Sequence, residues 1–273
     1  MTNPIHAQKI THSNRLEGSV VAITGAGSGN GKAAALRTGR EGASLYISDI
    51  NAELLEETIG DLKSEGINAQ GGIFDAANID DAPRFIAAVK EAHGRIDVLV
   101  NNAGAVKVEP FPNVSEENWD WTMNLNLKGA FFLMQEAAKH MIDQQSGNIV
   151  NIASIAGTFG GPTSSPSYAA AKAGLVNLTT VAAAVLAQYT IRVNAIAPGI
   201  INTPFHAPVD LAIGQDQLGL APGEHINTRV GLIPLGRLGE PEDVAATVAF
   251  LASEDAAHIS GETITVAGAM RSL

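Results

Sequence analysis

The sequence predicts an α/β fold in which a doubly wound parallel sheet of about seven strands carries helices on both faces. Apolar runs of strand length alternate with helical segments along almost the whole chain, and this alternation is typical of a parallel sheet. Glycine turns and polar residues follow several of these runs directly, at the sheet edge where such folds bind ligands. A length of 273 residues suits one domain of this class.

Composition and charge narrow the possible functions. Hydrophobic residues make up 45% of the chain and charged residues 16%, so the core is large and little surface remains for charge, which favours an oligomer. The formal net charge is −11 and no block of Lys or Arg occurs, which argues against nucleic acid and anionic membranes as partners. The chain has no cysteine, and its seven histidines show no close pairing, so we expect no metal site.

The N-terminal segment and the hydropathy bear on location. Residues 1–17 are polar and mixed in charge, without an apolar segment followed by a cleavage site, so we expect a flexible tail there and a single domain over 18–273. No run of about eighteen apolar residues is available to cross a bilayer. We therefore expect a cytoplasmic protein that does not enter the membrane.

The individual elements follow from hydrophobic period and length. The expected strands are short apolar runs that stop at glycine or polar residues: 19–24, 43–49, 69–74, 96–100, 148–153, 191–197 and 263–266. The expected helices lie between them: 32–40, 51–65, 79–91, 115–138, 173–188 and 240–252. Because strands and helices alternate to the end of the chain, helices should cover both faces of the sheet.

One segment, 203–238, breaks this alternation, because prolines and glycines interrupt its apolar residues and no period is visible. A long irregular segment beside a binding edge is typical of a substrate lid, and a merely structural insertion is the alternative. The side chains expected to line an apolar pocket beneath it are Phe159, Phe205, Leu211 and Leu218. His206 and His225 are lone loop histidines, which are mostly solvated, so we leave both out of the site.

A glycine-rich turn follows the first expected strand. The stretch from Gly25 to Gly31 has the spacing G-x-x-x-G-x-G and leads into a helical segment. This arrangement lets backbone N–H groups approach a phosphate, helped by the positive end of the helix dipole. The candidate cofactor contacts in this turn are Gly25, Ser28, Asn30 and Gly31. A tight turn without a ligand is the alternative.

The second expected strand ends in an acid. Asp49 stands eighteen residues after Gly31, where a carboxylate can accept hydrogen bonds from the adenosine ribose hydroxyls. The same charge repels a 2′-phosphate, so the sequence predicts NAD rather than NADP as the cofactor. The alternative role of Asp49 is an ordinary cap for the following helix.

A tyrosine and a lysine stand one helical turn apart. Tyr168 and Lys172 share a face of the helix that continues into 173–188. A nearby ammonium favours the phenolate, so we expect Lys172 to lower the pKa of Tyr168 toward the range in which a phenol works as an acid or base. A solvated surface pair has the same spacing, and the neighbouring motifs decide between the two interpretations.

These motifs, taken in order, resemble the short-chain dehydrogenases/reductases over about residues 17–268. The matching stretches are 24–31, 101–104, 126–129, Ser154, Tyr168 with Lys172, 198–203 and 237–244. Agreement at several motifs in one order favours a functional pair over a solvated one. The resemblance implies a Rossmann-like fold and hydride transfer between a nicotinamide cofactor and an alcohol or ketone.

The resemblance also implies a catalytic set, Asn126, Ser154, Tyr168 and Lys172. Tyr168 would exchange a proton with the substrate oxygen, which Ser154 would hold. Lys172 would lower the phenol pKa and bond the nicotinamide ribose. Asn126 would hold a water that links Lys172 to solvent, or would simply bond to backbone.

Further cofactor contacts and the assembly follow from the same resemblance. The additional contacts are Asp75, Ala76, Asn102, Ala103, Gly104, Pro198, Gly199, Ile201 and Thr203, together with Tyr168 and Lys172 themselves. The family commonly forms homotetramers by pairing of long helices, so we expect a homotetramer here.

The chain departs from the family pattern at several positions. Asn30 replaces a usual isoleucine and would place an amide near the nicotinamide. Thr38 and Gly39 stand inside the first helix, where a glycine costs about 1 kcal/mol against alanine, so we expect this helix to be less stable than in relatives. Ala267 and Ala269 replace an acid and a glycine of the family's C-terminal segment.

The predicted function is an NAD-dependent dehydrogenase or ketone reductase acting on a small secondary alcohol or ketone with an apolar body. A 3-oxoacyl-thioester reductase that uses NADP is one alternative, which residues 237–244 also resemble, although Asp49 and the lack of a basic residue at Ser28 argue against it. A non-catalytic NAD-binding sensor is the second alternative, and Asn30 is the feature that keeps it open.

Overall fold

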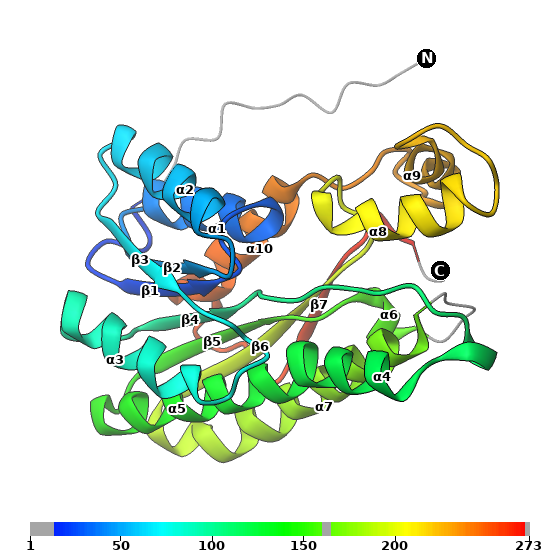
Figure 1. The fold of residues 1–273 in the computed structure, drawn as a ribbon. Helices are drawn as coiled ribbons and strands as arrows, with labels where there is room; N and C mark the ends of the chain where they lie inside the picture. The colour runs from blue at the N-terminus through cyan, green and yellow to red at the C-terminus, as the bar shows by residue number, and fades with distance from the viewer. Residues whose placement is uncertain (1–13, 160–164, 271–273) are drawn as a thin grey trace.

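Seven parallel strands form the central sheet of the computed structural model, which describes residues 14–159 and 165–270 (Figure 1). Their spatial order is β3-β2-β1-β4-β5-β6-β7. They are β1 (Val20–Thr24), β2 (Ser44–Asp49), β3 (Ala69–Ile73), β4 (Val98–Asn101), β5 (Gly147–Ile152), β6 (Ile191–Pro198) and β7 (Thr263–Val266). The predicted fold class is confirmed, and the strand order reverses between β1 and β4, the switch point at which such sheets bind ligands.

Helices cover both faces of the sheet (Figure 1). One face carries α1 (Gly29–Arg40), α2 (Ala52–Ser64) and α10 (Pro241–Ala252). The other face carries α3 (Asp81–His93), α5 (Gly129–Gln144) and α7 (Pro166–Leu186). Shorter helices are α4 (Glu116–Met123), α6 (Ile155–Thr158), α8 (Ala207–Val209) and α9 (Glu224–Thr228).

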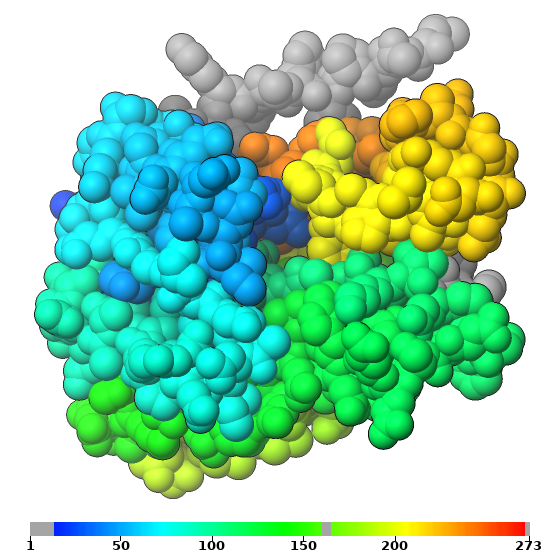
Figure 2. Space-filling model, in the orientation of Figure 1, coloured from blue at the N-terminus to red at the C-terminus, as the bar shows by residue number. Residues whose placement is uncertain are grey.

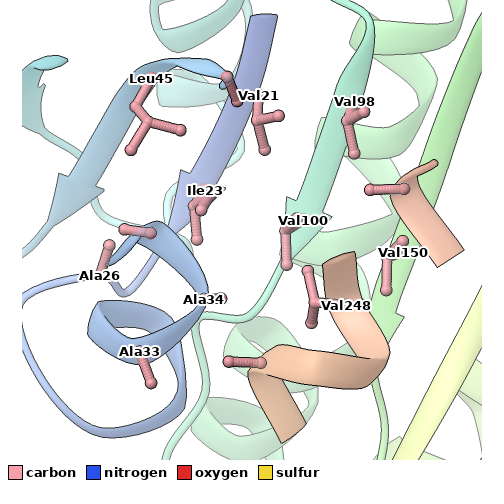
Figure 3. Close-up of a cluster of buried hydrophobic side chains, with 14 of the residues drawn as sticks. Val21, Ile23, Ala26, Ala33, Ala34, Leu45, Val98, Val100, Val150 and Val248 are labelled. Carbon is pink, nitrogen blue, oxygen red and sulfur yellow. The ribbon is translucent and has the colours of Figure 1, made fainter. Parts of the chain in front are cut away.

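The hydrophobic core has one layer on each side of the sheet, because successive side chains of a strand point to opposite faces. Val21 and Ile23 of β1 pack with Val100, Val150 and Val248 beneath α1 and α10 (Figure 3). The layer on the opposite face contains Ala22, Leu99, Ile149, Leu133 and Met141. Each fully buried aliphatic side chain contributes about 1.5–3 kcal/mol, so the two layers hold the strand ends in place.

The segment predicted as one helix over 115–138 is interrupted. A π-helical turn, Asn124–Lys128, separates α4 from α5. The wider turn shifts the helix surface, and it places Asn126 inside the protein at 1% exposure. Gly129 follows directly, and a Cβ there would lie 1.7 Å from the carbonyl oxygen of Ala76, so only glycine fits. The hydrophobic period of the sequence does not indicate this interruption, because a π turn changes the helical register by only one residue.

The glycine inside α1 has a packing role. A Cβ on Gly39 would lie 2.5 Å from Cγ2 of Ile67, so the glycine lets that side chain approach the helix. Thr38 is fully buried, and its hydroxyl donates to the carbonyl oxygen of Ala34 at 2.8 Å. The two residues that the sequence marked as unfavourable for the helix therefore fit the packing around α1.

Part of the expected N-terminal tail is ordered against the domain. Leu16 is 1% exposed within the core. The guanidinium of Arg15 pairs with the buried carboxylate of Glu41 at 2.9 Å. Residues 14–17 of the predicted tail thus pack on the domain, and residues 1–13 lie outside the described residues.

The segment 203–238 is not an irregular loop. It folds into five short helical pieces, Pro204–His206, Ala207–Val209, Asp210–Gln215, Glu224–Thr228 and Arg229–Leu232. A bridge between Ile201 and Gly239 closes its base. In Figure 1 it lies beyond the carboxyl ends of the strands, beside α6 and opposite α2. We keep the name lid for residues 203–238; that they close over a substrate stays a prediction.

One helix of the described residues, Pro166–Tyr189, is long and apolar enough to cross a membrane. Length and composition alone are weak support for a span, because a packed helix of a soluble protein passes the same test. Here α7 packs against β6 and α6.

Candidate active site

A cavity of about 1050 Å³ lies between the carboxyl edge of the sheet and the lid. Figure 2 shows it as a cleft between the yellow lid and the blue N-terminal part of the chain. The sequence-predicted residues that line it are Gly25, Ser28, Asn30, Asp49, Asp75, Ala76, Asn102, Ala103, Gly104, Ser154, Tyr168, Lys172, Pro198, Gly199, Ile201 and Thr203. Two other predicted site residues, Gly31 and Asn126, are not among the residues that line the cavity.

Close packing and hydrogen bonds fix the conformation of the glycine turn. Gly25 has a φ of 64°, in the left-handed region that favours glycine. A Cβ on Gly31 would lie 2.1 Å from the carbonyl oxygen of Gly25, so close packing requires glycine at this position. The amide of Asn102 donates to the carbonyl oxygens of Thr24 and Gly25, both at 2.9 Å. Asn102 therefore links the turns that follow β1 and β4.

The start of α1 faces the cavity with free backbone donors. Ser28 is its N-cap, and its side chain makes no capping hydrogen bond. Asn30 in the first turn lines the cavity, and its Oδ1 is buried without a hydrogen-bond partner among the described residues. The N–H groups of a helix start carry partial positive charge, so this end of the cavity suits a phosphate.

Asp49 is fixed by backbone donors at the far end of the cavity. Its Oδ2 accepts from the N–H of Gly27 and its Oδ1 from the N–H of Asn51, each at 2.9 Å. The N-cap of α2 is Asn51, whose side chain accepts from Leu54, so Asp49 is not the cap of that helix. Ile50 beside it is 67% exposed and lines the cavity as an apolar surface.

Ser154 and Tyr168 meet at the opposite end. Ser154 follows β5 as the N-cap of α6, and its Oγ accepts from the N–H of Ala156 at 3.1 Å. The hydroxyls of Ser154 and Tyr168 are hydrogen-bonded to each other. Ser165, which is closer to Tyr168 in the sequence, donates instead to the carbonyl oxygen of Lys107.

Lys172 lies one turn further along α7. It is 3% exposed, and its Nζ donates to the carbonyl oxygen of Ile152 at 2.8 Å. Burial lowers the pKa of Lys172 to about 8. Burial also raises the pKa of Tyr168, and the hydrogen bond from Ser154 opposes that rise only in part. The prediction that Lys172 lowers the phenol pKa is therefore wrong for this structure, because desolvation outweighs the charge.

Asn126 stands behind Gly104. Its amide nitrogen donates to the carbonyl oxygens of Ala105 and Thr122, at 3.0 and 3.1 Å, so the backbone-bonding alternative holds for that group. Its Oδ1 is buried without a partner among the described residues. A Cβ on Gly104 would lie 2.7 Å from this oxygen and 3.4 Å from Nζ of Lys172. Gly104 thus leaves the space where the two polar groups approach each other.

The lid brings residues into the cavity that the sequence did not assign. Phe205 lines it as expected, with its ring centroid 5.7 Å from that of Tyr168. Phe159, Leu211 and Leu218 are not among the lining residues, so their predicted place in the pocket is wrong. His206, His225 and Arg229 line the cavity instead, as do Trp121 and Val106. The sequence around this cluster has no period and gives no signal that would have marked it.

The residues present fit a dinucleotide with a nicotinamide. The cavity has a glycine turn and uncapped helix start for phosphates, a fixed carboxylate at one end and a serine–tyrosine pair at the other. Asn30 also lines the cavity, and its buried Oδ1 is available as a hydrogen-bond acceptor. Among the described residues, no group of three metal-ligating side chains occurs.

A doubly wound parallel sheet with this cavity at its switch point is the architecture of a dinucleotide-binding oxidoreductase. A family model described as short chain dehydrogenase matches residues 19–213, and the chain belongs to this family. Its members are oxidoreductases that act on CH–OH groups with nicotinamide cofactors.

Relatives of known activity differ in substrate and cofactor. The 3-oxoacyl-[acyl-carrier-protein] reductase FabG of Thermotoga maritima is 38% identical over 94% of this chain and 99% of its own. A structure of an actinorhodin polyketide ketoreductase variant with NADPH has a TM-score of 0.88 at 33% identity, covering 92% of this chain and 97% of its own. An NAD⁺-bound xylitol dehydrogenase has a TM-score of 0.86 at 31% identity, covering 93% and 99%.

Proposed function

We propose that this protein is an NAD-dependent dehydrogenase and ketone reductase for a secondary alcohol with an apolar body. The observation that carries the proposal is the hydrogen-bonded pair of Ser154 and Tyr168 at one end of a cavity whose other end is closed by Asp49. The chemistry that a bound nicotinamide would supply is hydride transfer, from the alcohol carbon in oxidation and to the carbonyl carbon in reduction. The cofactor would be held by the glycine turn, the start of α1, Asp49 and the residues after β3, β4 and β6.

The side chains move the proton. Ser154 holds the substrate oxygen by a hydrogen bond and stabilises charge that develops there. Tyr168 donates its proton to that oxygen in reduction and removes it in oxidation. Because burial keeps the phenol protonated at neutral pH, the reductive direction suits this structure there. Lys172 would bond the nicotinamide ribose, and Asn126 would hold a water that links Lys172 to solvent.

The preference for NAD rests on charge at the adenosine end. Asp49 accepts two backbone hydrogen bonds and keeps a lone pair for the ribose hydroxyls, while its charge repels a 2′-phosphate. The cations that line the described part of the cavity are Lys172 and Arg229, and both lie toward the catalytic end. No basic side chain stands beside Asp49 to offset that repulsion among the lining residues.

The apolar body of the substrate follows from the lining of the catalytic end. Its apolar members include Val106, Trp121, Phe205, Val209, Ile213 and Ile226. Burial of such surface contributes about 25 cal/mol per Å², so a substrate with several methylene groups or a ring gains affinity there.

Assembly and location are part of the same proposal. Val181 and Val185 lie one turn apart on α7 and are 51% and 56% exposed, which suits a helix covered by a partner. We propose a cytoplasmic homotetramer with two-fold axes. Light scattering after gel filtration measures the assembly, and a monomer at micromolar concentration contradicts this part.

The first alternative is a 3-oxoacyl-thioester reductase that uses NADP(H), which the similarity to the Thermotoga maritima FabG supports. The second is a non-catalytic NAD-binding sensor, which the departure at Asn30 leaves open. A ratio of kcat/KM with NADP to that with NAD separates the first alternative from the proposal. Cofactor binding without turnover identifies the second.

The test is steady-state kinetics on a panel of secondary alcohols and ketones with both cofactors, with Tyr168→Phe as the matched control. We expect turnover with NAD to exceed that with NADP and to fall by roughly 10²–10⁴ in the phenylalanine variant, since that variant lacks the hydroxyl group that exchanges the proton. In Asp49→Ser the NADP to NAD ratio should rise. Faster turnover with NADP in the unaltered protein contradicts the cofactor assignment.

A further inference from the structure

The lid holds a polar cluster that the proposed chemistry does not use. His206, His225 and Arg229 come from three different helical pieces of the lid, and all three line the cavity. His225 is 8% exposed, and neither of its ring nitrogens has a hydrogen-bond partner among the described residues. A buried polar group without a partner costs free energy, so such a side chain facing a cavity marks a site for a polar ligand group.

Arg229 differs from the other described arginines in lacking a partner. Its Nε is buried without a hydrogen bond, and the described part of the chain offers it no ion pair within 4 Å. The others pair with carboxylates, except for Arg192, which donates to backbone carbonyl oxygens; those with carboxylate partners are Arg15, Arg37, Arg40, Arg84, Arg95 and Arg237. In a chain of net charge −11, an uncompensated guanidinium in a cavity is an attractive site for an anion.

The buried acid of the lid does not neutralise this charge. Asp210 accepts from the N–H of Gly223 at 2.7 Å and from the side chain of Gln215 at 3.3 Å. Backbone N–H groups of His225 and Ile226 also bond to it, and these contacts hold its pKa below the usual range. Asp210 is not part of the cavity lining, so its charge serves the fold of the lid.

The cluster lies on the substrate side of the cavity, separated from the reacting end by an aromatic ring. The ring of Phe205 contacts both, with its centroid 5.7 Å from that of Tyr168 and 5.6 Å from that of His206. Burial lowers the pKa of His206 to about 4, and the nearby Arg229 and His225 add to this effect. His206 is therefore neutral near pH 7, where it can donate one hydrogen bond without a charge of its own.

We propose that the lid binds a carboxylate of the substrate, with Arg229 as the ion-pair partner and His206 and His225 as hydrogen-bond donors. The inference rests on the proposed function and specifies its substrate class: a hydroxy acid or oxo acid whose carboxylate is separated from the reacting carbon by an apolar segment that spans Phe205. A guanidinium binds a carboxylate through two parallel hydrogen bonds, and the apolar surroundings strengthen them.

The test compares acids with their own esters. A series of oxo acids from 4-oxopentanoate to 8-oxononanoate and the corresponding methyl esters are reduced with NADH by the unaltered protein and by Arg229→Leu, Arg229→Lys and Arg84→Leu. Arg84 is exposed and lies outside the cavity, so its variant controls for the loss of one positive charge. We expect one chain length of acid to be preferred, with kcat/KM about 10- to 100-fold above its ester, the range for a charged hydrogen bond.

In Arg229→Leu this preference should disappear through a rise in KM for the acid, while the ester changes by less than about threefold; Arg229→Lys should retain part of it. Equal use of acid and ester by the unaltered protein overturns the inference and leaves the proposed function intact. Should Arg229→Leu fail to fold, the acid-to-ester ratio of the unaltered protein and of Arg229→Lys still decides.

Calorimetry separates this inference from the proposed function. Cyclohexanecarboxylate and cyclohexanecarboxamide are titrated into the unaltered protein and Arg229→Leu without any reaction. Binding of the carboxylate alone, lost in Arg229→Leu, supports the carboxylate site even if no ketone is reduced. Binding of neither compound, together with equal turnover of acids and esters, removes it.

Discussion

The Nζ of Lys172 lies 5.6 Å from the ring centroid of Tyr168, and the ammonium donates its hydrogen bond to the carbonyl oxygen of Ile152 and not to the phenol. The lysine is held by the end of β5, directly before the turn that carries Ser154. The sheet edge thus sets the distance between the cation and the phenol, and both groups titrate in an environment that disfavours their charged forms.

The pH dependence of stability should report the buried state of Lys172. Its pKa is about 8 in the folded protein, against about 10.4 in an unfolded chain. Between these values the unfolded chain binds more protons, so this residue makes the free energy of unfolding rise with pH. Replacement by Met should remove a rise of about 2 kcal/mol between pH 7.5 and 9.5.

Urea titrations at the two pH values measure that difference. The control is Lys139→Met, because the Lys139 side chain is 60% exposed and should leave the pH dependence unchanged. Tyr168 has a raised pKa and opposes the rise only above about pH 10, outside the window. The same pH dependence in Lys172→Met and the unaltered protein would mean that the ammonium is solvated.

Gly104→Ala should strongly reduce turnover without unfolding the protein. The added methyl would lie 2.7 Å from Oδ1 of Asn126 and 3.4 Å from Nζ of Lys172, so these side chains must move. A displacement of this size at the reacting end typically costs about 10²-fold in rate. Kinetics together with a thermal melt check this, and full activity in Gly104→Ala would show that the two side chains do not act as a unit.

Gly39→Ala should destabilise the protein, although alanine is the better helix former by about 1 kcal/mol. The new methyl would lie 2.5 Å from Cγ2 of Ile67, and a well-packed core resists such insertion at a cost of about 1–3 kcal/mol. Gly60→Ala in α2 is the matched case, because nothing lies within 4 Å of its Cβ position, and it should stabilise by about 1 kcal/mol. Equal shifts in Tm for both variants would refute the packing argument.

Ala269→Gly should stabilise the fold. Ala269 has a φ of 67°, and a left-handed conformation costs an L-residue roughly 1–2 kcal/mol that glycine does not incur. Part of that gain is lost to the greater entropy of glycine in the unfolded chain, so we expect a net gain of about 0.5–1 kcal/mol. Ala257→Gly is the control, since Ala257 has a φ of −55° and should lose stability. Chemical denaturation of the two variants measures both signs.

The strands β1, β2, β4, β5 and β6 were predictable because most of their side chains are buried and each reads as a short apolar run with a polar or glycine end. All seven appear within about two residues of the expected bounds. The turns after β1, β2 and β4 were also predictable. Glycine and carboxylate residues directly after a strand of a parallel sheet are typical of a ligand-binding edge. The interruption of the long helix at Asn124–Lys128 left no mark in the hydrophobic period.

Sequence by itself determined the fold, the family and the order of the motifs, because burial on both faces of a strand and close backbone approach restrict the residue types allowed. Tertiary structure alone decided the direction of the Tyr168 pKa, since desolvation depends on atoms brought from distant segments. It also decided that His225 and Arg229 turn inward while Leu211 and Leu218 turn outward. In a segment without a period, only the packing of the lid on the sheet edge chooses which side chains face the cavity.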